Sequence, residues 1–134
     1  MPRHKLQKFQ ELSRFDNVAQ ITDLDIKNKL KKFLGKKFNV ILELACGKGE
    51  YTLALAKLYP NNKYIGIDIQ GERLWFACTN AKNKKLTNVF FLRIPIEDLN
   101  KYFKAKSISE IWITFPDPFP RLKQSKKRLT SPRF

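Results

Sequence analysis

The sequence offers little that could hold a metal ion. Its 134 residues contain one histidine, His4, and two cysteines, Cys46 and Cys78. Because these residues lack the spacing of a zinc site, we predict that the protein binds no metal. No apolar run approaches the roughly 20 residues needed to cross a bilayer, and the N-terminus lacks the apolar segment of a signal peptide. We therefore expect no membrane contact and a reduced, cytoplasmic compartment.

Acidic residues are scarce relative to basic ones. The chain has 27 lysines and arginines against 12 aspartates and glutamates, a net charge of +15. The excess is concentrated at the two ends: residues 1–39 carry ten basic and four acidic groups, and residues 121–134 carry six and none. Such an excess favours a polyanionic partner, with nucleic acid the first candidate. The alternative is that the basic ends are solubilising tails.

The pattern of apolar residues predicts a doubly wound α/β fold with a parallel sheet. Apolar segments typical of buried strands alternate with segments of helix formers. The predicted strands are 40–45, 64–69, 88–94 and 110–115, and the predicted helices are 25–35, 50–59, 72–86 and 97–103. Residues 1–24 give weaker signals. In such sheets the ligand binds beyond the carboxyl ends of the strands, here at 45–50, 68–71, 94–97 and 115–120.

The segment that follows the first predicted strand, ELACGKGEYT at 43–52, is a candidate ligand loop. It lacks the P-loop pattern, and Thr52 stands where a dinucleotide fingerprint needs a third glycine. The remaining pattern, with Glu43, Gly47 and Gly49, resembles motif I of class I S-adenosylmethionine (SAM) methyltransferases, where Ala45 replaces the commoner first glycine. The alternative is an ordinary tight turn between a strand and a helix.

Two further strand ends bear on the ligand. Asp68, nineteen residues after Gly49, can accept hydrogen bonds from both ribose hydroxyls of an adenosine, and we include its neighbour Ile69 in the site. The alternative role for Asp68 is to cap the next helix. After the third strand, Pro95 stands where many methyltransferases have a polar side chain for the adenine. Either the backbone or Glu97 replaces that contact, or the contact is absent.

The fourth strand end, FPDPFPR at 115–121, is followed by the basic stretch 123–129. Together they resemble the signature of tRNA (guanine-N7) methyltransferases, and the likeness extends over roughly residues 30–134. Phe119 stands for the usual tryptophan, and Gln124 and Ser125 replace a common histidine and its neighbour. The resemblance implies a Rossmann-like class I methyltransferase fold, SAM as the cofactor, and methyl transfer to N7 of a guanine in the variable loop of tRNA.

The resemblance also implies roles for individual residues. Glu43 and Asp68 match cofactor contacts, Asp117 matches the active-site acid, and Arg121 matches a basic substrate contact. The tail is expected to contact tRNA phosphates with assistance from the basic helix at 25–35, and its candidate residues are Lys123, Lys126, Lys127 and Arg128. Guanine N7 has an in-plane lone pair and no proton, so its methylation needs positioning and electrostatics rather than a general base.

Family members continue past the segment that matches residue 134, which predicts that this chain is an N-terminal fragment. We divide it into a basic extension with a helix, residues 1–38, and a partial methyltransferase domain, residues 39–134. The strand at 110–115 is then expected to be an open edge, and the activity to be weak or absent. The alternatives are a non-catalytic RNA-binding module and an NAD-dependent oxidoreductase, which Thr52 disfavours. The sequence indicates no oligomeric state.

Overall fold

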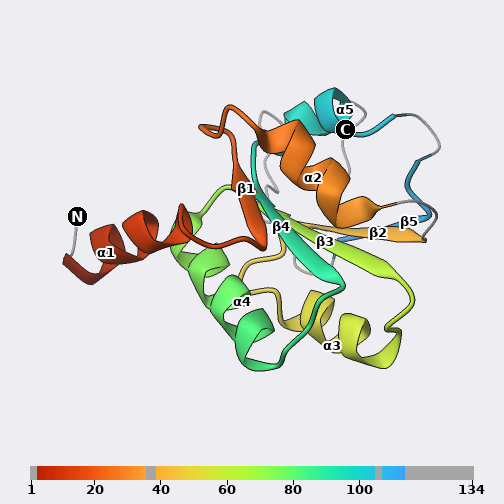
Figure 1. The fold of residues 1–134 in the computed structure, drawn as a ribbon, viewed down its shortest axis with the longest axis horizontal. Helices are drawn as coiled ribbons and strands as arrows, with labels where there is room; N and C mark the ends of the chain where they lie inside the picture. The colour runs from red at the N-terminus through yellow and green to blue at the C-terminus, as the bar shows by residue number, and fades with distance from the viewer. Residues whose placement is uncertain (1–2, 36–38, 105–106, 114–134) are drawn as a thin grey trace, which may run out of the picture.

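The fold is a parallel sheet covered by helices on both faces (Figure 1). The structure is a computed structural model that describes residues 3–35, 39–104 and 107–113. Its strands lie in the order β1-β4-β3-β2-β5, and all four pairings are parallel. The strands are β1 (Val18–Gln20), β2 (Val40–Leu44), β3 (Lys63–Asp68), β4 (Val89–Arg93) and β5 (Glu110–Trp112). The predicted α/β class is therefore confirmed.

The helices form two layers. Helices α3 and α4 cover one face of the sheet, and α2 and α5 cover the other (Figure 1). The helical elements are α1 (Arg3–Leu12), α2 (Ile26–Leu34), α3 (Glu50–Leu58), α4 (Gly71–Asn83), the 3-10 turn η1 (Ile96–Asp98) and α5 (Leu99–Tyr102). None of the helices in the described part of the chain is both long and apolar enough to cross a bilayer.

The central strands are apolar on both faces because each face is covered. All five residues of β2 are buried. In β4, Phe91 packs with α3 and α4, whereas Phe90 packs with α2 on the opposite face. Both rings are almost fully enclosed, and burying a side chain of this size stabilises the fold by about 2–3 kcal/mol.

Residues before the predicted helix at 25–35 contain two elements that the sequence pattern did not predict. Strand β1 pairs with β4, so that Val18 lies opposite Phe91 and Gln20 lies opposite Arg93. Helix α1 packs against α4, where the Trp75 Nε1–H donates a hydrogen bond to the Glu11 carboxylate at 2.7 Å. The N-terminal segment thus contributes a strand to the same sheet, while the division at residue 38 stays a prediction.

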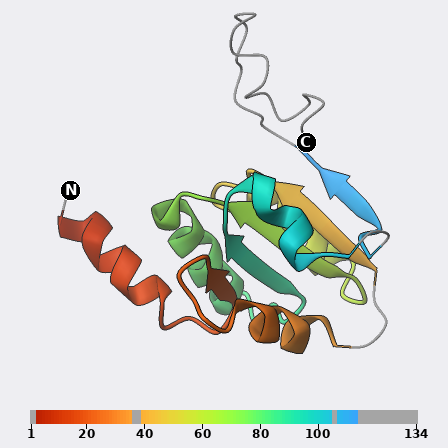
Figure 2. The same cartoon turned by 90° about the horizontal axis from the view of Figure 1, so that it is seen from above.

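The other elements agree with the sequence pattern except at their ends. The helix expected at 97–103 is a 3-10 turn followed by the single helical turn of α5. Strand β5 lies at the edge of the sheet opposite β1 (Figure 2), and within the described residues its one neighbour is β2. Its predicted end at residue 115 lies outside the described residues.

Candidate functional site

The loops that follow β2, β3 and β4 meet at one edge of the sheet. The pairing places Leu44 beside Ile67 and Asp68 beside Arg93, so the carboxyl ends of the three strands are in step. Three of the four segments expected to form the site therefore lie together. The fourth segment, residues 115–120, is outside the described part of the chain.

The loop after β2 turns sharply into helix α3. Ala45, Gly47 and Gly49 all have positive φ angles, of 54°, 60° and 72°. At Ala45 this conformation costs on the order of 1 kcal/mol, because its Cβ crowds the backbone. A Cβ atom at Gly49 would lie 3.0 Å from both Ala77 and the Phe91 ring. Glycine at position 49 is therefore required by space as well as by backbone conformation.

The side chain of Asp68 ties this loop to the end of β3. Its Oδ2 atom accepts a hydrogen bond from the Gly47 N–H at 2.8 Å, and its Oδ1 accepts one from the Gln70 N–H at 2.9 Å. Gln70 immediately precedes α4, so the second bond orders the entry to that helix. Each oxygen of the carboxylate retains a lone pair that can accept a further hydrogen bond.

Glu43 lies beneath the loop rather than at its surface. It is 5% exposed, and the Thr52 hydroxyl, which is 2% exposed, donates a hydrogen bond to its Oε1 atom at 2.5 Å. A buried carboxylate needs such donors, because without them its desolvation is costly. In the sequence, Thr52 served only to exclude a dinucleotide site. In the structure, its hydroxyl stabilises the buried Glu43 carboxylate. The nine-residue interval between the two side chains gave no signal of this contact.

The remaining cofactor candidates frame the same edge. Ile69, directly after Asp68, is 49% exposed, an apolar surface beside a polar carboxylate. Pro95 has an extended conformation and begins the 3-10 turn that contains Glu97. Glu97 is exposed, so its side chain is accessible from solvent at this end of the sheet.

Two contacts at this edge were not foreseen from the sequence. The Arg93 Nε–H donates a hydrogen bond to the Gln20 Oε1 atom at 2.7 Å, which fastens the end of β1 to the end of β4. The rings of Tyr51 and Trp112 lie 5.6 Å apart, centre to centre, and join the first turn of α3 to β5. Aromatic residues at these two positions were visible in the sequence, but only the sheet order brings them together.

Cys46 lies inside the loop but is not a reactive thiol. It is buried, and burial raises the pKa of its thiol well above the ordinary value, with the charges of Asp68 and Glu43 raising it further. The thiolate form, which is the nucleophile, is therefore suppressed at neutral pH. No group of three histidine, cysteine, aspartate or glutamate side chains among the described residues could hold a metal ion.

The predicted substrate-side residues lie outside the described residues. They are Asp117, Arg121, Lys123, Lys126, Lys127 and Arg128. The structure thus describes the cofactor half of the expected site, and the roles of these six residues stay predictions.

Comparison with known proteins identifies the family. Residues 37–134 match a family model described as "Putative methyltransferase". The chain is 42% identical to a tRNA (guanine-N(7)-)-methyltransferase of Christiangramia forsetii, over 98% of this chain and 62% of that protein. It is 37% identical to the protein of the same name from Bacteroides thetaiotaomicron, over 100% of this chain and 56% of the relative. These matches confirm the resemblance drawn from the sequence.

A solved structure agrees with this family. The fold matches one titled "Structure of an antibiotic related Methyltransferase" with a TM-score of 0.59 and 33% identity, over 72% of this chain and 49% of that one. The chain spans about three fifths of the length of the curated relatives it matches. Its matched segment begins just before β2 and includes the glycine loop and Asp68. The chain therefore belongs to the methyltransferase family whose model matches residues 37–134.

Proposed function

We propose that this chain carries the cofactor-binding part of a SAM-dependent tRNA (guanine-N7) methyltransferase. The observation that carries the proposal is the 42% identity of this chain, over 98% of its length, to the tRNA (guanine-N(7)-)-methyltransferase of Christiangramia forsetii. The basic excess of +15 supports a nucleic-acid substrate. Because the proposed substrate is tRNA, we place its action in the cytoplasm.

The described residues fit an adenosine-containing cofactor. Asp68 has lone pairs left for two ribose hydroxyls, and the exposed Ile69 offers an apolar surface to a flat base. Ala45, Gly47 and Gly49 keep the loop compact, so a ligand can approach its backbone closely. Glu43 supplies negative charge below the loop, and Glu97 is the candidate partner for the adenine amino group. When bound, SAM supplies a methyl group on a positively charged sulfur.

The substrate half of the site is assigned from the sequence. Asp117 lies between Pro116 and Pro118, whose rings restrict the backbone on both sides of the carboxylate. It would accept hydrogen bonds from the N1–H and the exocyclic amine of guanine, and its charge would favour the cationic ring that methylation produces. Arg121 and the lysine-rich tail would hold the tRNA through its phosphates. No side chain needs to remove a proton from N7.

The proposal is tested by incubating the chain with tRNA and SAM and measuring 7-methylguanosine in the digested RNA by mass spectrometry. SAM binding is measured in parallel by calorimetry. We expect SAM to bind and 7-methylguanosine to form at a low but measurable level. No heat with millimolar SAM would contradict the assigned cofactor, and methylation at another atom would contradict the assigned substrate. Binding of SAM and tRNA without methyl transfer would instead indicate a non-catalytic RNA-binding module.

A further inference from the structure

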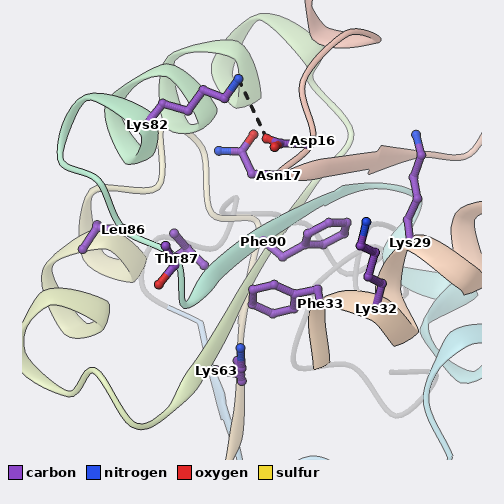
Figure 3. Close-up of a pocket in the computed structure, with 11 residues that line it drawn as sticks. Asp16, Asn17, Lys29, Lys32, Phe33, Lys63, Lys82, Leu86, Thr87 and Phe90 are labelled. Carbon is purple, nitrogen blue, oxygen red and sulfur yellow. Dashed lines mark ion pairs between the residues drawn. The ribbon is translucent and has the colours of Figure 1, made fainter. Parts of the chain in front are cut away.

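A second feature lies at the opposite end of the sheet from the glycine loop. A pocket with a volume of about 580 Å³ opens where β3 and β4 begin and where α2 and α4 end (Figure 3). We call it the amino-end pocket. Its lining residues are Asp16, Asn17, Lys29, Lys32, Phe33, Lys63, Lys82, Leu86, Thr87, Val89 and Phe90. It shares no residue with the candidate cofactor site.

The charge of the amino-end pocket is strongly positive. Four lysines from three elements line it, and Asp16 is the one acidic residue in its lining. Asp16 pairs with Lys82 at 3.8 Å, but the Asp16 side chain is largely exposed and the Lys82 side chain about half exposed, so water and salt weaken that pair. Lys32, on the same face of α2 as Lys29, is exposed to solvent. Lys29 pairs with Asp23 at 3.2 Å, and that pair is also partly exposed. An anion that enters the pocket would still meet ammonium groups from three elements.

The floor of the pocket is apolar and well ordered by its contacts. The Phe33 and Phe90 rings stack with their centres 5.1 Å apart (Figure 3), and the Lys63 Nζ atom lies 4.8 Å from the centre of the Phe33 ring. On the opposite wall, the Asn17 side chain donates a hydrogen bond to the Cys78 carbonyl oxygen at 3.1 Å. The lysines thus project from two helices and a strand rather than from a loop.

We propose that the amino-end pocket binds phosphodiester groups of RNA and is a second RNA contact, separate from the methyl-transfer site. This inference rests on the proposed function, since it takes the substrate to be a tRNA. Lysine clusters bind phosphate as point charges, and the apolar floor lowers the local dielectric around that charge. Strands of five or six residues separate the two sites by roughly 17–20 Å, close to the width of one nucleic-acid duplex, so a single folded tRNA can touch both.

The test compares two variants of the whole chain that each remove two positive charges. Lys32→Gln/Lys63→Gln removes charges from the pocket. Lys57→Gln/Lys84→Gln is the control, because both lysines are exposed, neither lines the pocket, and neither lies on the basic helix at 25–35. Affinity for fluorescently labelled tRNA is measured over a range of salt concentrations, and SAM affinity is measured by calorimetry.

We expect the pocket variant to bind tRNA about tenfold more weakly and to lose about two units from the slope of log affinity against log salt. The control variant should bind within about twofold of the unmodified chain, because lysines that touch no phosphate release no counterions. SAM affinity should be unchanged in both variants. Equal tRNA losses in the two variants would overturn the inference while leaving the proposed function intact.

Competition identifies the source of the phosphate. Inorganic phosphate or a mononucleotide at millimolar concentration should displace tRNA from the pocket only weakly, whereas unlabelled tRNA should displace it fully. If a mononucleotide displaces the labelled tRNA as completely as unlabelled tRNA does, the site is one for a small anion and the inference is wrong. Failure of the unmodified chain to bind any tRNA would overturn the proposed substrate together with the inference, and SAM binding measured in the same samples separates that outcome from an unfolded chain.

Discussion

The Asp68 carboxylate accepts a hydrogen bond from the backbone N–H of Gly47 at 2.8 Å, across the two central strands of the sheet. One side chain therefore sets the position of the glycine loop before any ligand binds. The same carboxylate is the candidate acceptor for the cofactor ribose. Loop order and ligand affinity are expected to be coupled through this residue.

Asp68→Asn should weaken both properties. The amide retains one oxygen as an acceptor, but its NH₂ group faces a backbone N–H that then has no partner. We expect the free energy of unfolding to fall by about 1–3 kcal/mol and the SAM dissociation constant to rise about tenfold or more. Denaturant titration and calorimetry measure the two effects. Asp16→Asn, at an exposed carboxylate away from the loop, is the control, and equal losses of SAM affinity in both variants would argue against the assignment.

Thr52→Val should reveal how Glu43 is stabilised. Valine keeps the shape of threonine but removes the hydroxyl that donates to the buried carboxylate. We expect the free energy of unfolding to fall by about 1–3 kcal/mol, since a charged acceptor loses one of its donors. Thr52→Ser retains the hydroxyl and should recover most of that loss in the same urea titration. If Thr52→Val leaves the free energy of unfolding unchanged, the hydroxyl does not stabilise the carboxylate and this account is wrong.

The two glycines of the loop should differ in their tolerance of alanine. Gly47→Ala makes only an ordinary contact, 4.0 Å from the Cδ atom of Arg73, so it carries the cost of positive φ alone, about 1–2 kcal/mol. Gly49→Ala adds contacts of 3.0 Å with Ala77 and Phe91, so its cost should rise to about 2–4 kcal/mol. Thermal unfolding of the two variants measures the difference, and similar midpoints would count against this steric account.

Much of the site's framework was predictable from the sequence, because its strands are long apolar runs. The segment that contains β2 could be assigned because it is almost continuously apolar, and Asp68 could be placed near a strand end because it follows the apolar residues of the strand predicted at 64–69. The partner of Asp68 could not be predicted in the same way. An apolar run locates a strand end, but it does not say which N–H group the facing turn presents.

Strand β1 shows the limit of local patterns more clearly. Its three residues are too few to display an alternating pattern, and Gln20 is a polar residue that is nevertheless buried. Its burial depends on Arg93, a residue 73 positions later in the chain, which donates a hydrogen bond to it. The amino-end pocket escaped prediction for the same reason, since its four lysines come from three elements that become neighbours only when the sheet forms.

Asp117→Ala should separate RNA binding from methyl transfer. The tail lysines and arginines supply most of the attraction to phosphate, so we expect tRNA affinity to stay within about threefold. Loss of the carboxylate that orients guanine and stabilises the ring cation should lower the yield of 7-methylguanosine by at least about 100-fold. Filter binding and mass spectrometry measure the two quantities. A large loss of tRNA affinity with normal methylation at saturating tRNA would contradict the catalytic role of Asp117.

Stability should fall at alkaline pH because of the buried thiols. Burial raises the pKa of Cys46 well above the ordinary thiol value of 9.0, so above that pH the unfolded chain releases a proton that the folded chain retains. The unfolded state then binds fewer protons, and the free energy of unfolding should decrease by about 1.4 kcal/mol per pH unit for each such thiol. Cys78, whose pKa burial also raises, adds a second contribution.

Lysines and tyrosines titrate in the same range, so the measurement compares the free energy of unfolding of the unmodified chain with that of Cys46→Ala from pH 8 to 10.5. That difference should narrow steadily above pH 9, and a constant difference would show that Cys46 ionises as easily in the folded state as in the unfolded one.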